Sequence, residues 1–292
     1  MAIHFTIERS GRAFRARADG GEAFFVGNQT SFADRSSGQD FEGLFNVPSR
    51  FLPRLLYAAA DVRDLYGFWA DFIAPTAKCE GGNFLTLNTY DRARFTWGFG
   101  QFGAHVPDGD FIGFFHDMLM RPEAQDYFPD LRLTAGRITK AVNGQPVALE
   151  SATTTAPLMA YLNPTMTAVE DSEVIAAAKL IHWTTTVKAA RDLQAQHMVG
   201  TFKRLMAEAD TRLGLDGRTA DICCVICDIR HQGRAKFAAM QAALGTGRPL
   251  QELLKLGAIT YRERINTLKA ALTAAGTLFT GKTWSRRAGD FI

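Results

Sequence analysis

The chain of 292 residues lacks a cysteine framework, a long apolar run and a large excess of either charge. Three of its four cysteines, Cys223, Cys224 and Cys227, crowd into one apolar segment, which is poor placement for disulfides that staple a fold. Cys224 and Cys227 have C-x-x-C spacing, but no second Cys or His pair follows at zinc spacing. We therefore expect small core residues in a buried helix and no metal site.

No stretch reaches the ~18 uninterrupted apolar residues of a membrane-spanning helix, which predicts no stable membrane insertion. The N-terminus carries charged side chains with no apolar block between them, unlike a secretory signal: Glu8, Arg9, Arg12, Arg15 and Arg17. We expect a protein that is made soluble in the cytoplasm. A target outside the membrane would require delivery by another system, such as a holin-type hole, a secretion machine or a phage particle.

The formal net charge is only +3 at pH 7. Local basic groups exist, at 282–287 and 230–234, but no long basic stripe with interleaved aromatics, zinc finger or RNA-recognition signature accompanies them. We therefore expect no nucleic-acid partner. The chain also lacks a G-x-S-x-G elbow, and the glycines at 245–247 form a helix connector rather than a phosphate loop. No cofactor is expected.

A hydrophobic content of 47% with 22% charged residues is typical of a globular protein with an ample core. Residues 1–45 mix short alternating runs with glycines and a Ser/Gly cluster at Ser36–Gly38, which predicts an N-terminal extension of irregular strands and loops. Apolar residues at spacings of three and four predict a helix over Phe51–Ile73 that Pro75 stops. Alternation in 84–89 and 95–99 predicts a short hairpin that turns at Asp91–Arg94.

The remainder is mostly helical in pattern. We predict helices over 110–120, 172–210 (one helix or two), 220–243, 249–256 and 260–275, and a small hairpin at Asn143-Gly144. No repeat or clean linker interrupts residues 46–292, which predicts one compact domain after the extension. The expected fold class is α+β and mainly α, with a small β-hairpin.

Two carboxyl groups invite a chemical interpretation. Cleavage of a glycosidic bond requires one carboxylic acid to protonate the leaving oxygen and one carboxylate to activate water or to stabilise the transition state. A helix that ends just before Glu80 and a hairpin that begins just after it would turn Asp91 back towards the glutamate across a groove. The apolar residues Phe84, Phe95 and Trp97 would favour the neutral acid that protonates a leaving group.

The segment from Glu80-Gly81 through Tyr90-Asp91 to Thr96-Trp-Gly-Phe-Gly100 resembles the active-site hairpin of the lysozyme-like superfamily. In phage-type lysozymes a helix-terminal Glu-Gly precedes a hairpin with a catalytic Asp and then a Thr before a Gly-x-Gly pair. In the related chitosanases four residues separate the Asp from the Thr, as they separate Asp91 from Thr96. The resemblance implies a lysozyme-like helical domain with Glu80 as general acid, Asp91 as base or charge stabiliser, and Thr96 as the hydroxyl that positions water.

The resemblance covers about 22 residues, and two features depart from the family pattern. The interval of 11 from Glu80 to Asp91 is slightly longer than in phage lysozymes and much shorter than in chitosanases. Gln101 stands where phage lysozymes usually have His. These departures affect the substrate and the stereochemical outcome more than the identity of the acid.

A sugar-binding groove is expected around the hairpin, because glycine lets a sugar ring approach the backbone closely. The sequence His182-Trp183 followed by Thr184–Thr186 would add stacking and hydroxyl contacts, although a Trp at helical spacing is more often a core residue. We expect the substrate-binding residues to be Tyr90, Trp97, Gly98, Gly100, Gln101 and His182.

Lysozyme-like enzymes commonly hold the catalytic glutamate with an arginine from a late helix. By this resemblance Arg262 or Arg264 is expected within hydrogen-bonding distance of Glu80, with Arg230 and Arg234 as alternatives. Bidentate guanidinium geometry suits this role.

Three functions therefore remain open. The first is a muramidase-like glycosidase of peptidoglycan, which the slight positive charge favours because peptidoglycan carries carboxylates. The second is a chitosanase-like or chitinase-like glycosidase. The third is a non-catalytic lysozyme-fold module for binding or assembly, which has no need for Glu80, Asp91 and Thr96 together.

Overall fold

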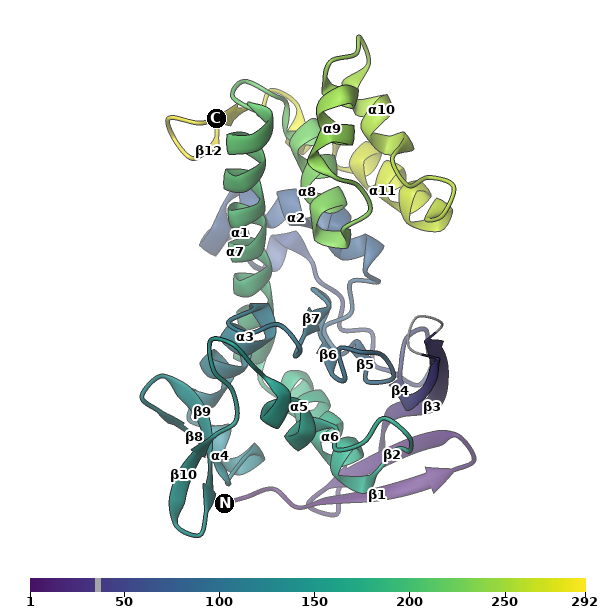
Figure 1. The fold of residues 1–292 in the computed structure, drawn as a ribbon, viewed down its shortest axis with the longest axis vertical. Helices are drawn as coiled ribbons and strands as arrows, with labels where there is room; N and C mark the ends of the chain where they lie inside the picture. Colours follow the sequence, from purple (N-terminus) through teal and green to yellow (C-terminus); the bar gives the residue numbers. More distant parts are fainter. Residues whose placement is uncertain (35–37) are drawn as a thin grey trace. The chain divides into compact units, whose positions relative to one another are not determined.

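The computed structural model describes residues 1–34 and 38–292 and divides them into two compact units (Figure 1). Unit 1 comprises Met1–Leu56 with Asn83–His197, and unit 2 comprises Tyr57–Gly82 with Met198–Ile292. Helices hold about 44% of the residues and strands about 20%, which confirms the α+β class. Of the Ser/Gly cluster at Ser36–Gly38, Ser36 and Ser37 lie outside the described residues.

Unit 1 contains a seven-stranded sheet whose strands follow one another in chain order. All neighbouring pairs are antiparallel. The strands are β1 (Phe5–Ser10), β2 (Ala13–Ala18), β3 (Phe24–Asp34), β4 (Gln39–Phe45), β5 (Leu87–Asn88), β6 (Thr96–Trp97) and β7 (Phe102–Gly103). The described residues of 5–34 and 38–45 thus form regular strands rather than irregular ones, and Gly11 and Gly20 adopt positive φ in the turns that connect β1 to β2 and β2 to β3.

This sheet also joins the N-terminal strands to the predicted hairpin. Phe45 of β4 pairs with Asn88 of β5, so no structural boundary falls at residue 45. The hairpin itself is confirmed, because Leu87 pairs with Trp97 and Asn88 with Thr96. Its strands are two residues each, shorter than the alternation predicts.

The other elements of unit 1 are helices and a second, three-stranded sheet. They are α3 (Asp110–Leu119), α4 (Ala124–Tyr127), β8 (Leu131–Thr134), β9 (Arg137–Val142), β10 (Gln145–Ala148), α5 (Ala156–Leu162) and α6 (Asp171–Thr186). The hairpin predicted at Asn143-Gly144 is confirmed by the pairing of β9 with β10. Helix α6 packs against β1, β2 and β3 (Figure 1). The stretch 172–210 is two helices, because Val187 is extended between α6 and α7 (Lys188–Leu213).

Unit 2 begins with η1 (Ala59–Asp61), α1 (Arg63–Tyr66) and α2 (Phe68–Cys79). The predicted helix over Phe51–Ile73 is wrong at both ends, since the main helix begins at Phe68 and continues through Pro75. Pro75 removes one backbone hydrogen bond. That cost is offset because Trp69, Phe72 and Ile73 are buried and α2 packs against α8 and α11.

The later helices of unit 2 are α8 (Ala220–Gln232), α9 (Phe237–Leu244), α10 (Pro249–Lys255), α11 (Arg262–Ala274) and α12 (Gly276–Phe279), followed by β11 (Trp284–Ser285) and β12 (Asp290–Phe291). The helix predicted over 220–243 is broken, because Gly233 adopts φ 75° and ends α8. The three cysteines of α8 are fully buried, as predicted for core residues. No helix in the described part of the chain is long and apolar enough to cross a membrane.

Candidate active site

Glu80 lies directly after the last residue of α2, which confirms its predicted position at a helix end. The helix ends there because Gly81 and Gly82 adopt φ 85° and 66°, a conformation that other residues rarely take. The Gly81 amide donates to the Lys78 carbonyl at 3.1 Å, which closes the last turn. The local signal for the end of the helix is therefore the glycine pair rather than Pro75.

The Glu80 carboxyl accepts a hydrogen bond from Arg264 of α11. Arg264 Nη1 lies 2.6 Å from Glu80 Oε1, and the Glu80 side chain is 17% exposed. The predicted contact between a late arginine and Glu80 is thus confirmed for Arg264, while Arg262 is exposed at the first residue of the same helix. A positive charge is well placed here, because the C-terminal end of a helix disfavours a lone negative charge.

Arg264 is itself anchored by a second, fully buried carboxylate. Its Nη2 donates to Asp228 Oδ1 at 2.7 Å, and Asp228 Oδ2 lies 2.6 Å from Nη1 of the buried Arg234. Arg234 also donates to the Leu256 carbonyl at 3.2 Å. We call Glu80, Arg264, Asp228 and Arg234 the charge cluster. It contains two carboxylates and two guanidinium groups, so its formal charges balance.

The charges of this cluster support one another in a poorly solvated region. Burial lowers the pKa of Arg264, but the neighbouring carboxylates Asp228 and Glu80 outweigh that effect and raise it above its ordinary value. Burial lowers the pKa of Arg234, and Asp228 counteracts the shift. His231 Nε2 approaches Glu80 Oε1 at 3.7 Å. Removal of one partner from such a buried set leaves a charge without compensation.

Asp91 lies in the loop between β5 and β6, and its carboxylate stabilises that loop. Oδ1 accepts from the Ala93 amide at 2.9 Å, and Oδ2 accepts from the Asn88 side chain at 2.8 Å. Both contacts are typical of an aspartate that shapes a turn. Asp91 also lines a shallow hollow of about 430 Å³ with Phe32, Asp34, Arg92 and His105 among its other walls.

Thr96 is in β6 and is largely buried. Asp91 and Thr96 both belong to unit 1, whereas Glu80 belongs to unit 2. Their predicted arrangement across a groove stays a prediction, as do the catalytic roles of all three.

Three buried amide side chains, which sequence reasoning missed, fasten the hairpin segment within unit 1. Asn46 bonds to both the Leu85 carbonyl and the Leu87 amide, each at 2.8 Å. Gln194 donates to the Phe84 carbonyl at 3.0 Å and accepts from the Phe99 amide at 3.3 Å. Asn163 donates to the Thr89 and Arg94 carbonyls, both at 3.0 Å. Gln194 could have been identified from the sequence as an amide side chain on a largely apolar helix face.

The glycines of the motif are explained by this packing rather than by a sugar. A Cβ on Gly98, whose φ is +77°, would lie 2.3 Å from Gln194 Oε1. A Cβ on Gly100 would lie 2.4 Å from the Phe102 ring. The lack of a Cβ at both positions thus allows other atoms to lie close to the backbone, as predicted. In this structure those atoms belong to protein side chains. Their substrate-binding role stays a prediction.

Two other expected substrate-binding residues are covered by protein to different degrees. Trp97 is 0% exposed, so it offers no face to a sugar in this structure. The His182 ring packs against Phe5 and Phe24 and bonds to the Tyr127 hydroxyl at 2.9 Å. Burial lowers the pKa of His182. Trp97 is therefore a core residue, whereas His182 is half-buried beside the rings of β1 and β3 and its binding role stays a prediction.

Tyr90 and Gln101 remain partly accessible. Tyr90 packs edge-on against Phe45 and is half-buried. Gln101 has φ 52° and donates to the Gly98 carbonyl at 3.2 Å, so it stabilises the turn after β6. A role in binding stays a prediction for both.

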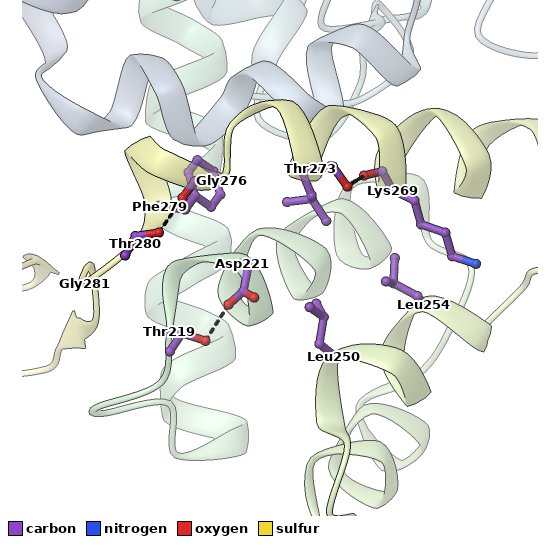
Figure 2. Close-up of a pocket in the computed structure, with 11 residues that line it drawn as sticks. Thr219, Asp221, Leu250, Leu254, Lys269, Thr273, Gly276, Phe279, Thr280 and Gly281 are labelled. Carbon is purple, nitrogen blue, oxygen red and sulfur yellow. Dashed lines mark hydrogen bonds between the residues drawn. The ribbon is translucent and has the colours of Figure 1, made fainter.

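Unit 2 also contains a separate cavity of about 610 Å³ (Figure 2). Its walls include Leu250 and Leu254 of α10, which point towards Thr273 of α11 in Figure 2. Two of its threonine hydroxyls donate within the wall, from Thr273 to the Lys269 carbonyl and from Thr280 to the Gly276 carbonyl. Asp221 is the only carboxylate among its lining residues, so the cavity does not offer the carboxyl pair that glycoside hydrolysis requires.

In residues 1–34 and 38–292, no three His, Cys, Asp or Glu side chains gather closely enough to hold a metal ion. Comparison of the chain with protein-family models, with curated proteins and with solved structures found no match.

Proposed function

We propose that the chain is a lysozyme-like glycoside hydrolase that cleaves β-1,4-linked amino-sugar polymers, with Glu80 as the general acid. The observation that carries the proposal is the hydrogen bond from Arg264 to Glu80, anchored behind by the buried Asp228. Burying charged groups is costly unless they are paired. A charge cluster whose outermost member is one partly exposed carboxyl is an arrangement that holds that carboxyl in a defined orientation.

The two Glu80 oxygens are suited to different tasks. Oε1 accepts the bond from Arg264 and orients the group, whereas no hydrogen bond to Oε2 is recorded among the described residues. A proton on Oε2 is therefore free to pass to a glycosidic oxygen while Oε1 keeps its contact. Proton donation to the leaving oxygen is the step that a general acid accelerates.

Asp91 is proposed as the second carboxyl, the base or charge stabiliser, and Thr96 as the hydroxyl that orients water. Their support is the resemblance of the hairpin and the hollow that Asp91 lines. The two hydrogen bonds that Asp91 accepts leave lone pairs on both oxygens for a water molecule. Asp91→Asn would keep the bond from the Ala93 amide but would oppose two amide groups at Asn88.

Peptidoglycan is the preferred substrate in this proposal. The formal charge of +3 favours a polymer that carries carboxylates over cationic chitosan. Chitosan and chitin are the alternative polymers. The non-catalytic module is a weaker explanation, because such a module gains nothing from an oriented, partly exposed Glu80.

The decisive test is Glu80→Gln. The amide oxygen can still accept from Arg264, but the amide nitrogen in place of Oε2 cannot act as an acid. Activity should fall by about 10² to 10⁴, equivalent to about 3 to 5 kcal/mol of barrier. Reducing ends released from purified peptidoglycan and from chitosan would measure it, and mass spectrometry of the fragments would name the bond.

Glu263→Gln is the matched control, because Glu263 is an exposed glutamate of α11 next to Arg264. This variant should cleave at the wild-type rate, and both variants should melt close to the wild-type temperature. A Glu80→Gln protein that melts normally and still cleaves at the wild-type rate contradicts the mechanism. If the wild type cleaves neither polymer, the binding module becomes the better interpretation.

A further inference from the structure

Glu173 of α6 is a buried carboxyl group that the proposed mechanism does not use. It is 0% exposed, and its Oε1 shares a short hydrogen bond with the Thr89 hydroxyl. Thr89 begins the Thr89–Arg94 loop that carries Asp91 and is also 0% exposed. A buried acid thus contacts the loop of the proposed second carboxyl.

Thr89 is in turn held against β4. Its Oγ1 accepts from the Leu44 amide at 2.5 Å, and its amide donates to the Leu44 carbonyl at 3.0 Å. Gly43 makes this approach possible, because a Cβ there would lie 2.6 Å from the Thr89 carbonyl carbon. The contact between β4 and the loop is therefore built into the backbone.

The other end of the loop, at Arg94, is linked to Thr89 through Asn163. Asn163 donates from one amide nitrogen to the Thr89 carbonyl and to the Arg94 carbonyl, each at 3.0 Å. Asn163 is also 0% exposed. Glu173 and Asn163 together hold both ends of the Asp91 loop through buried polar contacts.

No cation compensates a charge on Glu173 among the ion pairs recorded for residues 1–34 and 38–292. On its own helix, the carboxylate of Glu170 opposes ionisation of Glu173. Strand β4 and the loop, which meet at Thr89, also carry charged residues: Asp40 and Glu42 of β4, and Asp91, Arg92 and Arg94 of the loop. Three of these are engaged elsewhere: Glu42 with Gln29, Asp91 with Asn88, and Arg92 with Asp34.

Burial raises the pKa of Glu173 to about 7. In the structure the Thr89 hydroxyl donates to Glu173 Oε1. A neutral Glu173 can instead donate to Thr89 Oγ1, which frees the Thr89 proton for the Leu44 carbonyl at 3.4 Å. When Glu173 is ionised, Thr89 must donate to it, and the Leu44 carbonyl loses that bond. Burial opposes this charge more strongly than the hydrogen bonds from Thr89 and from the backbone at Leu44 and Glu170 favour it, and Oε2 has no hydrogen-bond partner in the described part of the chain.

We propose that Glu173 is a positioning residue whose proton orders the Asp91 loop, so that the loop is held when Glu173 is neutral and loosened when it is ionised. The consequence for catalysis rests on the proposed function, whereas the consequence for the loop does not. In a glycosidase, the second catalytic carboxyl group would then leave its position as the pH rises above neutral.

The test measures the loop directly, without any glycan. Hydrogen–deuterium exchange of peptides that cover residues 84–97 is followed from pH 5.5 to 8.5, with rates corrected for intrinsic exchange. In the wild type, local opening should increase by about tenfold or more, because the open loop restores the ordinary pKa of a glutamate. Glu173→Gln, whose amide donates to Thr89 Oγ1 at every pH, should remove the dependence. Glu22→Gln, an exposed glutamate of unit 1, should retain it.

Wild-type protection that is flat across this pH range would overturn the proposal, and so would a Glu173→Gln variant that keeps the wild-type slope. If the variant does not fold, the carbon-13 shift of the Glu173 carboxyl in the wild type decides. It must titrate together with the loss of protection. Should the protein cleave a glycan, the ratio of its activity above pH 7 to its activity at pH 6 must be higher in Glu173→Gln than in the wild type. Absence of cleavage refutes the proposed function and leaves the exchange result standing.

Discussion

The two units support their candidate catalytic side chains in opposite ways. In unit 2 the buried acid behind Glu80 is Asp228, which contacts two guanidinium groups. In unit 1 the buried acid behind the Asp91 loop is Glu173, which contacts a hydroxyl and lies among the amides and carbonyls around Asn163. One support consists of balanced charges, and the other consists of neutral hydrogen bonds.

This difference predicts how each region responds to its surroundings. The charge cluster pairs its carboxylates with two guanidinium groups, so we expect the position of Glu80 to depend little on pH in the neutral range. Glu173 has no such partner among its recorded contacts, so its support depends on a proton. The pH response of a buried carboxyl group therefore depends on its neighbours. A site behind such a group is rigid when a cation lies beside the carboxylate and pH-sensitive when no cation does.

The largest effect is expected from Asp228→Ala, which removes the centre of the charge cluster. Arg234 would remain buried without a counter-ion and Arg264 would keep only Glu80, so the free energy of unfolding should fall by about 3 to 5 kcal/mol. Urea unfolding followed by circular dichroism measures the loss. Asp64→Ala, at an exposed aspartate of the same unit, should change stability by less than about 0.5 kcal/mol. A loss below about 1 kcal/mol at Asp228 would show that the cluster is solvated.

A smaller effect, in unit 1, should follow from Gly98→Ala. The new Cβ clashes with Gln194 and the backbone has φ +77°, so strain and crowding together should cost about 2 to 4 kcal/mol. Gly144→Ala is the matched control, since its φ is +78° with nothing within 4 Å, and it should cost only about 1 to 2 kcal/mol. Thermal melting of both variants separates crowding from backbone strain. Equal losses would mean that the Gln194 contact is unimportant.

The smallest expected effect concerns Asp210 of unit 2, whose pKa shift has the opposite sign to that of Glu173. Arg286 donates to both of its oxygens, at 2.7 and 2.9 Å. Arg286 lowers the pKa of Asp210 through these bonds. A lowered pKa contributes stability above the ordinary range near pH 4, and that stability is lost as the pH falls through the folded-state value.

Arg286→Ala should therefore lower the free energy of unfolding slightly at pH 7, and the difference from the wild type should shrink below about pH 4. Arg287→Ala, at the exposed neighbouring residue, should leave stability unchanged at both pH values. Unfolding curves at pH 3, 4, 5 and 7 measure the difference. A cost for Arg286→Ala that is constant from pH 3 to 7 is inconsistent with an ionised Asp210 as its partner.

Features set by neighbouring residues were predictable from the sequence. The hairpin over 84–99, the turn at Asn143-Gly144 and the position of Glu80 at a helix end all depend on local patterns. Even so, the interpretation of Pro75 was wrong, because burial of the α2 face outweighs one missing hydrogen bond. The glycine pair after Glu80 was the better signal.

Features set by distant residues were not predictable in the same way. The Arg264 contact spans 184 residues and was expected only through a family resemblance. Asp228 was overlooked within an apolar helix, although a lone acid among buried cysteines is itself a signal. Gly98 was interpreted as a sugar contact because nothing near it in sequence points to Gln194, which approaches from α7.

The alternation of the chain between the two units has a consequence for synthesis. Helix α2, with Trp69 and Phe72 on its buried face, leaves the ribosome about 140 residues before α8, the first of the helices α8 and α11 that cover it. At ordinary translation speeds this is a wait of roughly 10 to 30 s. Until Phe202 of α7 contacts Phe72, about 120 residues after α2, no later helix covers this aromatic face, and hydrophobic surface of this kind is what chaperones bind. Slow or interrupted translation between residues 80 and 220 should therefore lower the yield of native protein more than a pause after residue 275.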